Sequence, residues 1–520
     1  MATELFGAIY IGSYEVSLKI FEFSSRKKIR EIDHVRARLD LGMDIYKTGR
    51  VGYELVDELC DILSEFAEIM KGYKVADKRV YASAILREAD NDLFVADQIY
   101  LRTGFEVNVI SNSENRFIGY KSVAGRERFE KMIQDSAAVV DIGGSAIQIT
   151  LFRKGKLIIT RHMEIGTVRL RELLSNYGHT LGRYERQMEE YVSKKLEVFC
   201  SMYLSEKVEN IIFLNDYCSE LVRTMEKNHS QDNIVKAERL IKYIEKLQKE
   251  SVEEISEELG LSSDKDALIV PSITMVKVIT RKLGATQVWV PGVNMNDGIA
   301  YDYAQEKRLL KVSHDFDADI LSAAQYLSEH FNSYSPHIET LKKLSTKIFD
   351  TMKKVHGMGE RERLLLQVAV MLHDCGKYVS LSNSPRCAYE IIMSSEIIGL
   401  KDIERQMIAY IVLYNTLLLE PYEALKEHLD KDSYLIVAKL SAILRVANAL
   451  DQSHRQKFQD IHIALKGREL VITVESLEDI SLEQALFESK TSYFERVFSM
   501  KPVLREKRVY NYKSKEQCLE

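Results

Sequence analysis

Residues 137–151, with the sequence AAVVDIGGSAIQITL, constrain the fold of this chain more than any other stretch. Small and β-branched apolar residues lead into Asp141, a Gly-Gly-Ser turn follows, and apolar and polar side chains then alternate. This pattern predicts a strand, a tight turn and a second strand. Because glycine has no Cβ, the turn can approach a bound group closely, and Asp141 is placed to hold a metal or a water there. An ordinary β-hairpin with a Gly-Gly turn is the competing interpretation.

A segment near the N-terminus, residues 7–20, repeats this pattern. Its sequence GAIYIGSYEVSLKI consists of an apolar strand, the turn residues Gly12 and Ser13, and an alternating strand. Repetition of one supersecondary unit indicates related substructures. The two hairpins therefore predict two related lobes that face each other across a cleft.

The length of 520 residues exceeds what one hydrophobic core usually serves, so several domains are expected. Strand and helix patterns alternate in the first part of the chain, whereas long amphipathic helical patterns begin near residue 313. Strand patterns return at 460–475. We predict a first lobe over 1–125, a second lobe over 126–310, a helical domain over 311–458 and a small α/β subdomain over 459–520.

Composition excludes several classes of protein. The formal net charge of -6 argues against a nucleic-acid binder. The chain contains no run of about 18 apolar residues, so no membrane span is expected. Six cysteines without CxxC spacing indicate reduced thiols, and the N-terminal residues lack the pattern of a signal peptide. These features predict a cytoplasmic protein.

Six blocks of sequence carry a resemblance to a known family. They are AIYIGSYE, SAILREADND, VISNSENR, VVDIGGSAIQITL, EIGTVRL and VPGVNMNDGIAYD, within residues 5–305. Their order and spacing resemble the exopolyphosphatase / guanosine pentaphosphate phosphatase family. The resemblance implies an α/β fold with two actin-like (ribonuclease H-type) lobes, followed by an all-helical HD-type domain and a small C-terminal α/β appendix. It also implies a homodimer that removes the terminal phosphate of inorganic polyphosphate or pppGpp, with Mg²⁺ or Mn²⁺ in the cleft.

The resemblance assigns roles to individual residues of the cleft. Glu114 matches the family's catalytic base, and Asp141 matches the aspartate that binds the metal or orients the attacking water. The residues that match phosphate-binding positions are Gly12, Ser13, Arg87, Gly143, Gly144 and Ser145. These roles suit the chemistry, because a dense anion needs cations and backbone N–H donors, and phosphoryl transfer needs charge neutralisation and a positioned nucleophile.

The chain also departs from the family pattern. Tyr10 stands where an aspartate is usual, Gln148 stands where an acidic residue is usual, and residues 215–219 replace an expected Gly-Gly-Thr loop. Fewer carboxylates should weaken the binding of hard cations. An alternative is therefore a sensor that binds (p)ppGpp or polyphosphate without turnover. The missing Gly-Gly-Thr loop also argues against an ATP-dependent sugar kinase.

The helical region carries a second candidate site. His337, His373, Asp374 and Asp451 occur in the order H…HD…D, with the flanking sequences LHDCGK and LRVANALD. HD-type phosphohydrolases bind metal with this arrangement, and imidazole with carboxylate suits Mn²⁺, Fe²⁺ or Zn²⁺. We expect a single divalent metal here. A further alternative places the hydrolytic chemistry in this domain.

Overall fold

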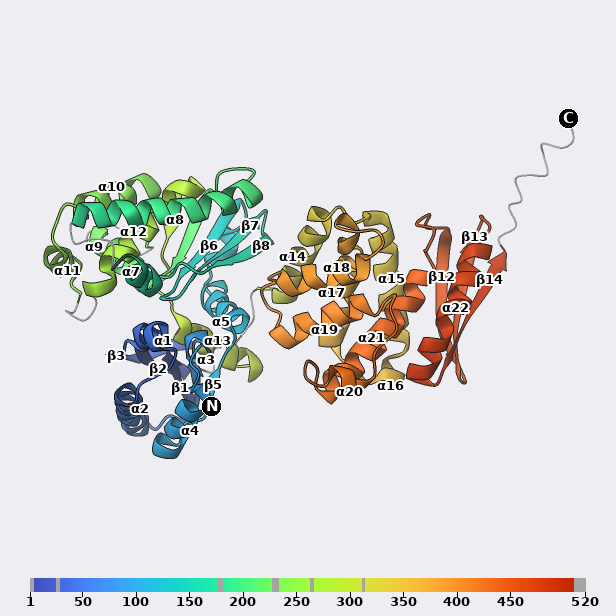
Figure 1. Cartoon of the computed structure of the whole chain (residues 1–520), viewed down its shortest axis with the longest axis horizontal. Helices are drawn as coiled ribbons and strands as arrows, with labels where there is room; N and C mark the ends of the chain where they lie inside the picture. The colour runs from blue at the N-terminus through green and yellow to red at the C-terminus, as the bar shows by residue number, and fades with distance from the viewer. Residues whose placement is uncertain are drawn as a thin grey trace, which may run out of the picture. The chain divides into compact units, whose positions relative to one another are not determined.

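A computed structural model describes residues 4–24, 29–175, 181–226, 233–261, 266–310 and 314–508 (Figure 1). The chain forms two compact units, Met1–Phe316 and Asp317–Glu520. Among the described residues, no helix combines the length and the apolar character needed to cross a membrane.

The first unit contains two mixed β-sheets that share a five-strand pattern, to which the second sheet adds one antiparallel edge strand. The first sheet has the order β3-β2-β1-β4-β5 and the second the order β10-β11-β9-β6-β7-β8. The strands of the first sheet are β1 (Glu4–Ile11), β2 (Glu15–Phe23), β3 (Ile29–Arg38), β4 (Asp77–Ala82) and β5 (Val107–Val109). Those of the second are β6 (Ser136–Ile142), β7 (Ile147–Arg153), β8 (Lys156–Met163), β9 (Asn210–Leu214), β10 (Ile234–Lys236) and β11 (Gln287–Trp289).

The correspondence between the sheets follows from strand pairing. In each sheet three antiparallel strands, β1–β3 or β6–β8, come first in the chain, and the first of them pairs in parallel with the next strand, β4 or β9. The two hairpins predicted from residues 7–20 and 137–151 are therefore confirmed, and they occupy equivalent positions in the two sheets.

The helices of the first unit pack their apolar faces against the sheets. In α2, the side chains of Leu59, Leu63, Phe66 and Met70 recur at helical spacing and are buried, so they give the helix one core face. The helices are α1 (Leu41–Thr48), α2 (Tyr53–Tyr73), α3 (Ala84–Arg87), α4 (Asp92–Thr103), α5 (Asn112–Ala124), α6 (Phe129–Met132), α7 (Thr167–Ser175), α8 (Leu181–Tyr203), α9 (Asp216–Met225), α10 (Ala237–Leu247), α11 (Val252–Leu259), α12 (Asp266–Leu283) and α13 (Met295–Glu306).

Helix α13 returns from the second sheet to the first. It packs on α5 and on strands β1 and β2. The buried Asn296 side chain donates hydrogen bonds to the carbonyl oxygens of Ala8 and Ser17, and Asp297 pairs with the buried Lys19 at 2.8 Å. The range predicted for the second lobe, 126–310, thus ends in a helix that packs on the first sheet. The predicted lobe boundaries remain an interpretation.

The second unit consists of helices followed by a three-stranded sheet. Its helices are α14 (Phe316–His330), α15 (Ser335–Thr351), α16 (Lys353–His356), α17 (Glu360–Leu372), the 3₁₀ helix η2 (Cys375–Tyr378), α18 (Ser384–Ser394), α19 (Asp402–Leu413), α20 (Tyr422–Leu425), α21 (Lys431–Ala449) and α22 (Ser481–Phe498). The sheet has the order β12-β13-β14, with β12 (Phe458–Lys466), β13 (Glu469–Ser476) and β14 (Lys501–Arg508). The predicted turn between β12 and β13 contains Gly467, whose φ is +61°.

Candidate functional site

A cavity of about 250 Å³ in the first unit is lined by residues of both sheets. The β1–β2 and β6–β7 turns form part of its wall, and they share the same internal hydrogen bond: Gly12 N–H donates to Glu15 at 2.9 Å, and Gly143 N–H donates to Ala146 at 2.9 Å. A Cβ on Gly144 would collide with the Ser13 hydroxyl, so the two turns lie directly against each other. Glycine is required at this contact for that reason.

The backbone N–H groups of the two turns are suited to bind an anion. The N–H groups of Gly12 and Gly143 are used inside the turns, whereas those of Ser13, Gly144 and Ser145 bond to no acceptor among the described residues. All five residues line the cavity. Their role in phosphate binding remains a prediction. Successive N–H groups in a turn can form a concave site for phosphate oxygens.

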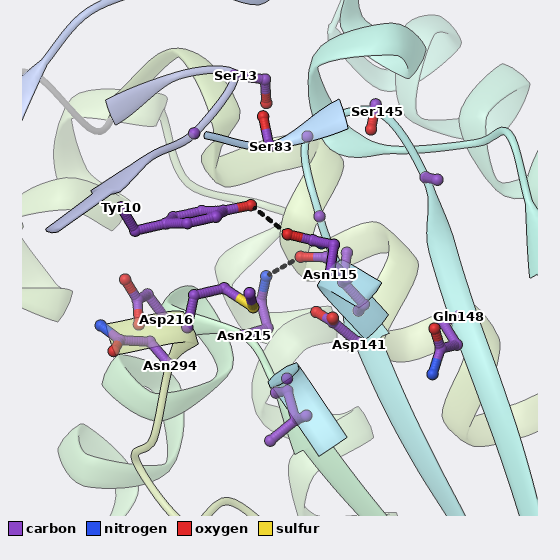
Figure 2. Close-up of a pocket in the computed structure, with 18 of the residues that line it drawn as sticks. Tyr10, Ser13, Ser83, Asn115, Asp141, Ser145, Gln148, Asn215, Asp216 and Asn294 are labelled. Carbon is purple, nitrogen blue, oxygen red and sulfur yellow. Dashed lines mark hydrogen bonds between the residues drawn. The ribbon is translucent and has the colours of Figure 1, made fainter. Parts of the chain in front are cut away.

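Asp141 lies at the end of β6 and also lines the cavity. Burial raises the pKa of Asp141 to about 6, and the nearby Arg116 guanidinium offsets this rise in part. The carboxyl group can therefore exchange a proton close to neutral pH. Figure 2 shows Asp141 near Asn115, with Gln148 on the neighbouring strand.

Gln148 stands opposite Asp141 in the register of β6 and β7. Its Nε2 donates to Thr150 Oγ1 at 3.3 Å, but its Oε1 is buried and accepts no hydrogen bond from any described residue. A carboxylate oxygen and an unpartnered amide oxygen are ligands that hard cations prefer, and Mg²⁺ often takes few protein ligands beside substrate phosphates and water. The residues present therefore fit a divalent cation.

Tyr10 and Asn115 face Asp141 with uncharged groups. The Tyr10 hydroxyl donates to Asn115 Oδ1 at 2.8 Å (Figure 2). Burial, and then the neighbouring Asp141, raise the pKa of Tyr10 well above its usual range, so its hydroxyl stays protonated. Neither group can accept a proton from water at neutral pH.

The side chain of Glu114, the base implied by the resemblance, bonds to the start of its own helix, α5. Ser111 begins α5, and the Glu114 carboxylate accepts bonds from the Ser111 N–H at 3.1 Å and from the Ser111 hydroxyl at 3.0 Å. This is a capping box, which ties the side chain back to the start of the helix. Among the described residues that line the cavity, α5 contributes Asn112, Asn115, Arg116, Gly119 and Ser122, and Glu114 is not one of them. The catalytic role of Glu114 remains a prediction.

Arg87 also lies apart from the cavity. Its guanidinium is exposed at the end of α3 and donates to the carbonyl oxygen of Val109 at 2.8 Å. Arg116 and His162 are the basic residues among the described cavity-lining residues, and the acidic ones are Glu15, Asp141 and Asp216. The role of Arg87 in phosphate binding therefore remains a prediction. Arg116, the last residue of the block VISNSENR, is the arginine that lines the cavity, although the resemblance assigned it no phosphate-binding role.

The second unit brings the predicted HD-type residues together. His337 Nδ1 bonds to Asp451 Oδ2 at 2.8 Å, and His373 Nδ1 donates to the carbonyl oxygen of Val370 at 2.7 Å. The Nε2 atoms of both histidines are buried and make no hydrogen bond with any described residue. Asp374 Oδ1 lies 3.3 Å from His373 Nε2. Two imidazoles oriented through Nδ1, with Nε2 unpartnered, resemble the second-shell arrangement of metal sites.

His454 adds a residue that sequence reasoning missed. Ligand atoms of His337, Asp374 and His454 lie within 4.8 Å of one another. Burial lowers the pKa of His373 and of His454, which favours the neutral imidazole that binds metals. His454 stands three residues beyond Asp451, outside the H…HD…D pattern, so only its proximity to the motif could have indicated it.

Comparison with models of protein families shows which family the chain belongs to. A model described as the Ppx/GppA phosphatase family matches residues 21–307, more than half of the chain. The chain belongs to the Ppx/GppA phosphatase family. A model for Ppx/GppA phosphatase domain III matches residues 321–491. The resemblance read from the sequence blocks is therefore confirmed, and the HD-type assignment of the second unit remains a prediction.

Two curated relatives match this Ppx/GppA family member at low identity. Guanosine-5'-triphosphate,3'-diphosphate pyrophosphatase of Vibrio atlanticus is 23% identical over 381 residues, 72% of this chain and 72% of that protein. The bifunctional 3-dehydroquinate synthase/phosphatase of Fusobacterium nucleatum is 25% identical over 134 residues, 25% of this chain. The match spans only 20% of the Fusobacterium protein.

Solved structures support the fold. The Ppx/GppA family member of Aquifex aeolicus superposes with a TM-score of 0.50 and 18% identity, over 60% of this chain and 100% of that one. An exopolyphosphatase from Cytophaga hutchinsonii gives a TM-score of 0.52 and 16% identity, over 60% of this chain and 100% of that one. The predicted actin-like α/β fold is confirmed.

Proposed function

We propose that the cavity of the first unit removes the terminal phosphate of inorganic polyphosphate or of pppGpp. The observation that carries this proposal is Asp141, a carboxyl group with a pKa of about 6, which lines a cavity whose wall includes both glycine turns. Asp141 accepts the proton of the attacking water, and the N–H groups of Ser13, Gly144 and Ser145 bind the phosphate oxygens. Arg116 adds positive charge beside them.

A divalent cation is the cofactor that the family uses in general. We propose that Asp141 and Gln148 hold Mg²⁺ or Mn²⁺ through a carboxylate oxygen and Oε1. When bound, such a cation neutralises charge that develops on the transferred phosphoryl group. The experiment is phosphate release from long-chain polyphosphate and from pppGpp, with each cation and with a chelator. Release that depends on the cation supports the proposal, and absence of release from both substrates contradicts it.

Glu114→Gln separates the two candidate bases. Glutamine can still close the capping box. We therefore expect phosphate release to stay within about tenfold of the wild-type rate, because Asp141 rather than Glu114 takes the proton. Ser111→Ala, which disrupts the same cap without removing the carboxylate, is the matched control. A loss of about 10²-fold or more in Glu114→Gln alone would return the role of base to Glu114.

Binding without turnover is the second candidate function. Tyr10, Asn115 and Gln148 surround Asp141 with side chains that are uncharged at neutral pH. A site with one carboxylate in this position supports ligand binding more readily than hydrolysis, since both the base and the cation depend on that single group. Calorimetric binding of pppGpp by the full chain, together with no phosphate release, would favour this sensor function.

We also propose that the second unit binds a single divalent metal, Mn²⁺, Fe²⁺ or Zn²⁺. The Nε2 atoms of His337 and His373, which are buried and make no hydrogen bond with any described residue, support this proposal, and Asp374 and Asp451 are the carboxylates that the motif supplies. Phosphate release that is lost in Asp374→Ala but kept in Asp141→Asn would place the hydrolytic site in this unit.

The homodimer implied by the resemblance also remains a prediction, which the molecular mass in solution would test.

A further inference from the structure

Strand β8 places His162 on the wall of the cavity, in line with Asp141 and Gln148. Asp141 on β6 lies opposite Gln148 on β7, and Gln148 lies opposite His162 on β8. Residues that are paired in this way on neighbouring strands point to the same face of the sheet. All three residues line the cavity. Their side chains therefore form one row across three strands.

Hydrogen bonds between β7 and β8 support this assignment of faces. Thr150 and Thr160 are paired in the same register, and their hydroxyl oxygens lie 3.0 Å apart. Gln148 Nε2 donates to Thr150 Oγ1 at 3.3 Å. His162 follows Thr160 by two residues, and side chains two residues apart on a strand point to the same face. The imidazole of His162 therefore projects from the same face as the amide of Gln148.

The row of Asp141, Gln148 and His162 has the length needed to span a reacting phosphoryl group. Neighbouring strands are about 4.8 Å apart, so the backbones at Asp141 and His162 are about 10 Å apart. Side chains stand roughly perpendicular to a sheet, so their end groups keep about this spacing. A hydrogen bond of about 2.8 Å at each end leaves about 4 Å between the two bonded atoms of a ligand. This distance suits an attacking oxygen and a leaving oxygen on opposite sides of one phosphorus.

We infer that His162 donates a hydrogen bond to the oxygen that leaves when the terminal phosphate is removed. This inference rests on the function proposed above, and it adds the residue that contacts the second phosphate of the chain. The attacking water bonds to the terminal phosphorus and gives one proton to Asp141. The bond from that phosphorus to the bridging oxygen breaks, and the electron pair stays on the bridging oxygen.

An N–H donor at the leaving oxygen stabilises the transition state more than the bound substrate, because negative charge develops there only as the bond breaks. Imidazole has at least one N–H group in both its neutral and its charged form. The role of His162 therefore requires a donor and no transfer of a proton from the ring.

The test measures phosphate release from pppGpp by variants of the full chain. His162→Ala removes the donor, and we expect kcat to fall by about 10²-fold or more while KM stays within about threefold of the wild type. His162→Gln keeps an N–H donor and should recover at least about tenfold of that loss. Arg161→Gln is the matched control and should retain the wild-type rate, because Arg161 lies on the opposite face of β8 and donates to the Tyr203 hydroxyl at 3.0 Å.

The outcomes separate the role of His162 from the proposed function. A kcat of His162→Ala within about threefold of the wild type, beside a loss of about 10²-fold in Asp141→Asn, would overturn this inference and leave the proposed function intact. Equal losses in His162→Ala and His162→Gln, or a raised KM with unchanged kcat, would also overturn it. A wild-type chain that releases no phosphate would refute the proposed function itself. Circular dichroism shows whether each variant folds, and His162→Leu, which also lacks a donor, serves if His162→Ala does not.

Discussion

Asp141→Asn is expected to lower phosphate release by at least about 10²-fold. An amide cannot accept the proton of the attacking water, and it is a weaker ligand for a hard cation than a carboxylate. The measurement is phosphate release under single-turnover conditions at pH 7.5, with pppGpp and with polyphosphate. Asp216→Asn is the matched control, because Asp216 also lines the cavity but pairs with Arg36 at 3.0 Å. A rate near that of the wild type in Asp141→Asn would contradict the assignment.

The same substitution should raise stability above pH 6. Because the pKa of Asp141 is raised in the folded protein, the native state retains a proton that the unfolded chain has lost between about pH 4 and pH 6. This group therefore destabilises the fold progressively as pH rises through that window. Asp141 is only partly buried, which reduces the effect, so we expect Asp141→Asn to gain about 1 to 2 kcal/mol at pH 8 and almost nothing at pH 4. Denaturant unfolding at both pH values measures the difference.

Gly298→Ala should destabilise the first unit by about 2 to 3 kcal/mol, even after a gain of about 1 kcal/mol in helix propensity. A Cβ on Gly298 would overlap the backbone carbonyl group of Ile118, because α13 crosses α5 at this point. A backbone group cannot move aside as the end of a flexible side chain can. Urea unfolding of the full chain, followed by circular dichroism, measures the loss.

Gly72→Ala is the control for Gly298→Ala. Gly72 lies in α2, and no atom of a described residue outside its own stretch of helix lies within 4 Å of the position that its Cβ would take. We expect this variant to be as stable as the wild type or more stable by about 0.5 to 1 kcal/mol. Equal changes in the free energy of unfolding for Gly298→Ala and Gly72→Ala would show that the close contact between α5 and α13 does not determine the cost of the added methyl group.

The repeated hairpins could be predicted because they depend on local sequence. Alternation of apolar and polar residues around Gly12 and Gly143 fixes strand, turn and strand without reference to the rest of the chain. The return of α13 to the first sheet could not be predicted in this way. It depends on contacts between Asn296 and the backbone of β1 and β2, which are far away in sequence.

The sequence of α5 contains two local signals that bear on its part in the cavity. Ser111 and Glu114 have the S-x-x-E spacing of a capping box, which assigns the Glu114 carboxylate to the helix start. Asn115, Gly119 and Ser122 recur at helical spacing, and this face lines the cavity. Both signals were present in the sequence. His454, by contrast, lies outside the H…HD…D spacing, and it is the folded chain that brings it against His337 and Asp374.

The pH dependence of kcat/KM for phosphate release tests the central claim most directly. If Asp141 accepts the proton of the attacking water, activity requires its ionised form, so kcat/KM should rise with pH and level off. A cation bound to Asp141 favours the ionised carboxylate, so the apparent pKa should fall from about 6 as the concentration of Mg²⁺ rises. The measurement uses the full chain and pppGpp between pH 4.5 and 8, at several concentrations of Mg²⁺. A profile that is flat at low Mg²⁺, or an apparent pKa that does not move with the concentration of Mg²⁺, would contradict the account.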